Sequence, residues 1–201
     1  MMDVDAGLVK KLREACGAGM MDCKMALVDA KGDMDEALKI LRKKGMASAD
    51  RKATRAANEG TIDCYIHPGA KVGVLLEVNC ETDFVARNEE FRAFVHDVAM
   101  HIAAASPAWV SREDIPPDVV AAELEIYTAQ ARQSGKPDAV VQKIADGKLG
   151  KWFSEVVLLE QEFVKDPEKC IDELRRELVG KIGENVEIRR FARFRVGDEV
   201  A

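Results

Sequence analysis

The chain has 201 residues, a net charge of −6 and an apolar content of 47%. This apolar content provides a core for one large domain or two small ones. The acidic balance disfavours broad binding to a nucleic-acid backbone, which needs a basic surface. No apolar run reaches the length of about 18 residues that a membrane span requires. We therefore expect a globular protein that binds no nucleic acid directly and no membrane.

The thiols and the first residues indicate a compartment. The acidic segment from Met1 to Asp5 lacks the basic start and the apolar stretch of a signal peptide. Five cysteines occur, at positions 16, 23, 64, 80 and 170, without a C-x-x-C pair. This usage is typical of reduced thiols, so we predict a cytoplasmic protein. Cys64 and Cys80 occupy strand positions that are expected to face inward, as small core residues.

Residues 1–45 are predicted to form a bundle of three short helices. The first apolar stripe ends at the Gly17–Gly19 turn, because glycine is the usual C-terminal stop. Asp33 and Glu36 have the spacing of a capping box that begins the third helix. Met20 and Met21 follow the glycine turn. They are equally consistent with a binding surface and with core side chains.

Residues 46–58 are rich in alanine and polar residues, which predicts a helical linker. Seven basic residues lie between positions 39 and 55: Lys39, Arg42, Lys43, Lys44, Arg51, Lys52 and Arg55. A solvated helix face explains them better than a nucleic-acid site, since no aromatic residues are interleaved to stack on bases.

The remainder, residues 59–201, predicts an α+β layer. Residues 60–80 have the alternation of a β-hairpin. Residues 186–196 form a third strand, with Phe194 and Val196 on the apolar face. Helices over 88–104 and 170–182 are expected to cover that face. The fold class is therefore α+β, with an antiparallel three-stranded sheet after the three-helix bundle.

A helical hairpin is predicted at about 118–148. Helices over 118–133 and 137–148 are joined at Gly135 and Pro137, which are residues that end and begin helices. The following segment, 149–165, contains two large aromatic residues but no clear period, so it receives no assignment.

The stretch from Thr82 to Val85 lies between an alternating strand and a helix that Asn88 is expected to cap. An acid followed by a large aromatic residue is unusual for a solvated turn. In one interpretation Phe84 folds into the core and Asp83 caps the helix. In the other, both side chains face outward to a partner. Spacing alone favours the first.

Motifs for catalysis are absent. There is no P-loop, dinucleotide-binding or nucleophile-elbow sequence. His96 and His101 are five residues apart and face different sides of one helix, which disfavours a shared metal. Glu81 and Asp83 have no phosphate-binding loop beside them to complete a Mg²⁺ site. We expect no catalytic residue, metal or cofactor.

Two motifs resemble those of a known family. The segment from Asn79 to Ala86, Asn-Cys-Glu-Thr-Asp-Phe-Val-Ala, is similar to the central motif of the translation elongation factor Ts family. The segment from Gly17 to Lys24, Gly-Ala-Gly-Met-Met-Asp-Cys-Lys, is similar to its N-terminal motif. Similarity continues through residues 180–190 and therefore covers nearly the whole chain.

This resemblance implies a non-catalytic guanine nucleotide exchange factor for the GTPase elongation factor Tu. Residues 1–45 would be a ubiquitin-associated-like domain, and residues 59–201 a dimerisation-type core domain. Thr82, Asp83, Phe84 and Val85 would dislodge Mg²⁺ from the partner and promote GDP release. Further partner-binding residues would be Arg13, Met20, Met21, Asn79 and Cys80. Long family members carry two core units and this chain has room for one, which implies a possible homodimer.

Three other classes of function stay open at this stage. One is an adaptor that binds proteins through the three-helix domain. Another is a thiol- or metal-dependent enzyme, against which the cysteine placement argues. The third is an RNA binder that uses the basic segment 39–55, and its affinity would fall steeply with salt.

Overall fold

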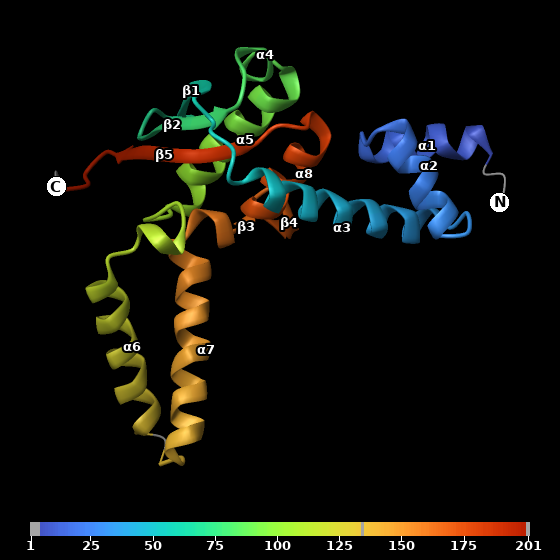
Figure 1. The fold of residues 1–201 in the computed structure, drawn as a ribbon. Helices are drawn as coiled ribbons and strands as arrows, with labels where there is room; N and C mark the ends of the chain where they lie inside the picture. Colours follow the sequence, from blue (N-terminus) through green and yellow to red (C-terminus); the bar gives the residue numbers. More distant parts are fainter. Residues whose placement is uncertain (1–4, 134, 200–201) are drawn as a thin grey trace. The chain divides into compact units, whose positions relative to one another are not determined.

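The structure is a computed structural model that describes residues 5–133 and 135–199. Three N-terminal helices, α1 (Ala6–Cys16), α2 (Met20–Asp29) and α3 (Met34–Lys52), surround a small core of their own (Figure 1). Leu12 and Leu27 are fully buried in it. The Asp33 side chain accepts a hydrogen bond from the backbone N–H of Glu36 at 2.9 Å, so the predicted cap is confirmed. The bundle is thus observed, while its ubiquitin-associated type stays a prediction.

Helix α3 is longer than the third helix of the prediction. It spans 19 residues and includes residues 46–52 of the predicted linker. Its second half contacts helix α8 (Ile171–Ile182) through an ion pair of Asp50 with Arg176 at 3.2 Å. The two helices also approach closely at glycines, because a Cβ on Gly180 would lie 3.3 Å from the Cα of Gly45. These contacts explain why the helix continues to Lys52.

The predicted fold class is confirmed in its α+β layer. Strands β1 (Glu59–Ile66), β2 (Val72–Cys80) and β5 (Val186–Arg195) form a three-stranded antiparallel sheet with β2 in the centre. The alternation in β2 buries Val74, Leu76, Val78 and Cys80. The other elements of this layer are helices α4 (Asp83–Ala86) and α5 (Glu89–Ala105), and a small antiparallel pair, β3 (Glu162–Phe163) and β4 (Asp166–Cys170).

The prediction of which side of the outer strands is covered is confirmed only for the start of β5, where Val186 and Ile188 are buried. Cys64, Phe194 and Val196 are exposed, although the alternating pattern placed them on the covered face. The opposite side of β1 and of the second half of β5 contacts α5 instead: Asp63 pairs with His96, and Arg193 donates to the carbonyl of Ala103. An alternating strand defines two faces, but only its packing partner determines which one is buried.

The predicted helical hairpin is confirmed as α6 (Pro117–Arg132) and α7 (Asp138–Val156), which run side by side in Figure 1. Helix α7 continues past the predicted end at 148. Phe153, in its last turn, packs with Ile115 and Val157, and this cluster also includes the half-buried Trp152. Two 3₁₀ turns, η1 (Arg112–Asp114) and η2 (Leu158–Glu160), flank the hairpin. Tertiary packing therefore determines the helix end that the sequence period did not show.

The chain divides into two compact units. The first comprises Met1–Ile62, Glu77–Val95 and Glu173–Ile188, and the second comprises Asp63–Leu76, His96–Asp172 and Arg189–Ala201. Among the described residues, no helix is both long enough and apolar enough to span a bilayer.

Candidate functional site

The candidate site is the turn that connects β2 to α5. Thr82 begins the four-residue helix α4, and its hydroxyl accepts a hydrogen bond from the N–H of Val85 at 3.4 Å. Val85 and Ala86 are the buried side of this helix, at 9% and 8% exposure. With these two residues turned inward, the other side of the helix carries Asp83 and Phe84.

Phe84 projects outward from this turn and is 85% exposed, more than any other large apolar side chain of the described residues. The interpretation of Phe84 as a core residue was therefore wrong. Asp83 does not cap the next helix either, because Asn88 does so: its side-chain oxygen accepts from the N–H of Glu90 at 2.7 Å. Asp83 instead forms an exposed ion pair with Arg87 at 2.9 Å. Such a pair contributes little to stability, so both groups are available to a partner.

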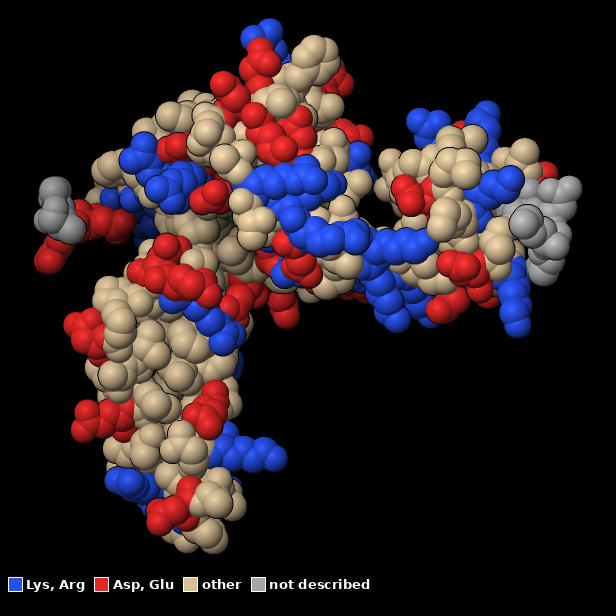
Figure 2. Space-filling view, viewed as in Figure 1, with Lys and Arg blue, Asp and Glu red and all other residues tan. Residues whose placement is uncertain are grey.

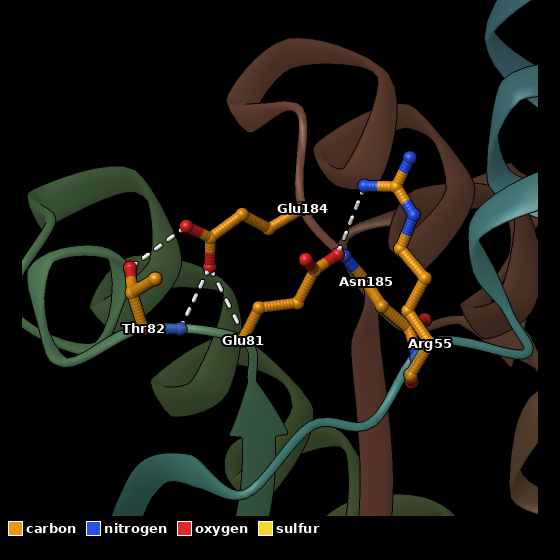
Figure 3. Close-up of polar contacts among 5 residues, drawn as sticks. All are labelled: Arg55, Glu81, Thr82, Glu184 and Asn185. Atoms are coloured by element: carbon orange, nitrogen blue, oxygen red, sulfur yellow. Dashed lines mark hydrogen bonds and ion pairs between the residues drawn. The ribbon is translucent and has the colours of Figure 1, made fainter.

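A carboxylate from a distant segment braces the start of the turn (Figure 3). Glu184 accepts hydrogen bonds from the backbone N–H groups of Glu81 and Thr82 at 3.2 and 3.0 Å. It also accepts one from the Thr82 hydroxyl at 2.7 Å. The carboxylate therefore binds both residues that lead into α4.

The Glu81 carboxylate makes the reverse connection. It accepts a hydrogen bond from the backbone N–H of Asn185 at 2.7 Å, and it forms an ion pair with Arg55 at 3.4 Å. The Asn185 side chain, 3% exposed, donates to the carbonyl of Arg55 at 2.9 Å. Figure 3 shows the five residues of this network, Arg55, Glu81, Thr82, Glu184 and Asn185, converging on the turn.

Two of the predicted partner-binding residues lie behind the turn. Cys80 is fully buried, and its thiol donates to the carbonyl of Thr82 at 3.2 Å. Burial raises the pKa of Cys80 to about 11, so the thiol is protonated and weakly nucleophilic at neutral pH. The Asn79 side chain donates to the carbonyl of Ala57 at 3.2 Å. Cys80 therefore supports the turn from within the protein, whereas Asn79 contacts the segment before β1.

The N-terminal motif presents apolar side chains to solvent. Met20 and Met21, in the first turn of α2, are 46% and 69% exposed. They are therefore not core residues, and their role in binding a partner stays a prediction. Met25 and Val28 are exposed on the same helix, and Arg13 is exposed on α1. The spacing of residues 21, 25 and 28 puts them on one helix face.

Comparison with known proteins identifies the family. The family model "Elongation factor TS" matches residues 44–175. The protein "Elongation factor Ts" of Geobacter sulfurreducens is 53% identical over 98% of this chain and 91% of its own length. The protein of the same name from Anaeromyxobacter sp. strain K is 57% identical over 98% and 90%, respectively.

The chain belongs to the elongation factor Ts family. The resemblance found in the two sequence motifs is confirmed. Family membership assigns the protein to the elongation stage of translation.

For this member of the elongation factor Ts family, sequence reasoning missed the residues that brace the turn. Glu184 and Thr82 are 102 positions apart, and no local pattern connects them. The only sequence signal for Glu184 was the similarity to the family through residues 180–190. That similarity did not indicate that Glu184 contacts Thr82.

The two histidines of α5 make separate contacts. His96 pairs with Asp63, whereas His101 is buried and bonded to Gln161, so the two histidines are separate as predicted. Within residues 5–133 and 135–199, no group of three or more His, Cys, Asp or Glu side chains is placed to hold a metal ion.

Basic side chains lie along α3 in Figure 2. Several of them pair with acids: Lys39 with Glu36, Lys44 with Asp29 and Arg42 with Glu173; just after the helix, Arg55 pairs with Glu81. This pairing favours a solvated helix face over a nucleic-acid site.

Proposed function

We propose that this protein is a guanine nucleotide exchange factor for elongation factor Tu, acting in the cytoplasm. Membership of the elongation factor Ts family supports elongation factor Tu as the partner. The main support for the mechanism is the exposure of Phe84, at 85%. A large aromatic ring gains free energy when a partner covers it, and such rings are frequent hot spots of interfaces.

The exchange follows from differential binding. A GTPase holds GDP through backbone amides around the phosphates and through Mg²⁺, which side chains on neighbouring loops position. An exchange factor binds the nucleotide-free GTPase more tightly than the GDP-bound one. The ratio of these two affinities is also the ratio by which the exchange factor weakens GDP binding. Such a factor needs no catalytic residue of its own.

The turn supplies the parts of a wedge. Phe84 is inserted into the partner and displaces the elements that hold Mg²⁺. Asp83 leaves Arg87 and either pairs with polar groups of the displaced element or repels the phosphates. Thr82 and Val85 hold the short helix that carries both side chains, through the bond of 3.4 Å between them.

A second contact comes from the N-terminal bundle. Arg13, Met20 and Met21 are exposed and bind the nucleotide-binding domain of the partner. Methionine suits this task because its flexible side chain adapts to the partner surface. This contact supplies affinity, while the wedge supplies the rate of release.

The release of fluorescent GDP from elongation factor Tu, measured by stopped flow, tests the proposal. The wild-type protein accelerates release, and Phe84→Ala lowers the maximal rate by roughly thirtyfold, the equivalent of a hot spot of about 2 kcal/mol. Ile126→Ala removes an apolar side chain that is 48% exposed on α6, and it serves as the matched control with an unchanged rate. A wild-type rate in Phe84→Ala refutes the wedge.

We also propose that two copies of the chain pair. Four apolar side chains of the second unit are 50–71% exposed: Ile66 on β1, Leu75 on β2, Phe194 on β5 and Val196 just after β5. An exposed apolar patch of several side chains is typical of an interaction surface. Sedimentation at micromolar concentration is expected to give twice the chain mass of 22.2 kDa, and Phe194→Glu to give the monomer. A wild-type protein that sediments only at 22.2 kDa contradicts pairing.

A further inference from the structure

The turn that carries Phe84 has little local stabilisation of its own. Helix α4 has four residues, and the hydrogen bond of its cap is long, at 3.4 Å. So short a helix is unstable in isolation, because it makes few of the bonds that repay the ordering of its backbone. Contacts from outside the turn must therefore fix the direction in which Phe84 points.

Glu184 supplies the closest of these contacts. Its three hydrogen bonds reach two backbone N–H groups and one hydroxyl, at 2.7–3.2 Å, all on the two residues before α4. Bonds from an ionised carboxylate are stronger than those between neutral groups. Losing the carboxylate leaves the N–H groups of Glu81 and Thr82 without their partner.

Glu81 completes a reciprocal clamp. While Glu184 holds the backbone of residues 81 and 82, the Glu81 carboxylate holds the backbone N–H of Asn185 at 2.7 Å. Asn185 in turn bonds the carbonyl of Arg55, which connects the segment after α3 to the same cluster. Each carboxylate thus fixes the chain next to the other, and loosening one loosens both.

We propose that Glu184 and Glu81 are positioning residues for nucleotide exchange, which hold the turn so that Phe84 enters the partner in one orientation. The inference rests on the proposed role of Phe84. Neither carboxylate is itself required to touch the partner. A ring on a fixed turn enters its pocket without an ordering cost, whereas a ring on a loose turn must be ordered in the step in which it enters the pocket and the nucleotide leaves.

The clamp has a specific kinetic signature. The N-terminal contact residues are unchanged when the clamp is lost, so the concentration of factor at half-maximal rate changes little. The wedge acts only as the nucleotide leaves, so its loss lowers the maximal rate. An effect on the maximal rate alone separates positioning from a general loss of binding or of folding.

The test is Glu184→Gln in the stopped-flow assay. The amide keeps one acceptor oxygen for the two N–H groups, but it loses the charge, and its NH2 can only donate to the Thr82 hydroxyl, so the charge-assisted bonds become weaker neutral ones. We expect the maximal rate to fall at least tenfold, the half-maximal concentration to stay within twofold, and hydrogen exchange at residues 82–86 to increase. Glu173→Gln is the matched control, because it changes a glutamate on α8 that pairs with Arg42 at 2.8 Å, outside the clamp.

A double variant decides whether Glu184 acts through Phe84. Adding Glu184→Gln to Phe84→Ala is expected to cause no further loss, since a turn without its ring has nothing to position. Losses that multiply overturn the proposal. So does a wild-type maximal rate in Glu184→Gln. If Glu184→Gln does not fold, Glu81→Gln is measured in its place with the same expectation.

The outcomes also separate this inference from the proposed function. A wild-type rate in Phe84→Ala refutes the wedge and with it the clamp. A loss in Phe84→Ala together with a wild-type rate in Glu184→Gln refutes only the clamp.

Discussion

Two phenylalanines seven positions apart make opposite predictions for the same substitution. Phe91, in the first turn of α5, is completely buried, whereas Phe84 is 85% exposed. Phe91→Ala leaves a cavity and removes buried apolar surface, which typically costs about 3–5 kcal/mol of unfolding free energy. Phe84→Ala removes almost no buried surface, so its effect on stability should stay within about 0.5 kcal/mol.

Thermal melting followed by circular dichroism measures both variants. For a chain of this size, 1 kcal/mol corresponds to a shift of about 2–4 °C, so Phe91→Ala should melt roughly 6–20 °C below the wild type. Phe84→Ala should melt within about 2 °C of it. A large drop for Phe84→Ala means that its ring is covered within the protein, which refutes both the wedge and the clamp that positions it.

Three further predictions concern buried or closely packed groups. Burial lowers the pKa of His101 below 6.5, so the unfolded chain takes up a proton that the folded chain does not. The free energy of unfolding therefore falls as the pH drops below about 6.5. Urea unfolding at several pH values should show a smaller fall for His101→Gln than for the wild type. Alkylation at neutral pH should modify the exposed Cys64 well before Cys80, whose pKa is raised to about 11; equal rates contradict the buried position. In Gly60→Ala the new Cβ would overlap the backbone oxygen of Val78, at a φ of 151° that alanine rarely adopts. Urea unfolding should therefore give a loss of about 2–4 kcal/mol. An unchanged unfolding midpoint rules out this close approach.

The sequence by itself determined the local elements of this protein. The apolar period of residues 91–102 predicted α5 to within a residue at each end, and its cap at Asn88 is observed. The cap at Asp33 and the hairpin of β1 and β2 were equally predictable. These features depend on residues a few positions apart, whose spacing alone brings them together.

Only the tertiary structure decided which surfaces are covered. The alternation in β1 and β5 was clear, but contacts with α5 put Cys64 and Phe194 outside. Spacing alone favoured a buried Phe84, and only the structure showed its neighbours Val85 and Ala86 turned inward and its own ring exposed. Glu184 meets Thr82 across 102 positions, and no local spacing encodes such a contact. Burial and long-range hydrogen bonds depend on where the folded chain brings its segments together, and that information is not present in any single stretch of the sequence.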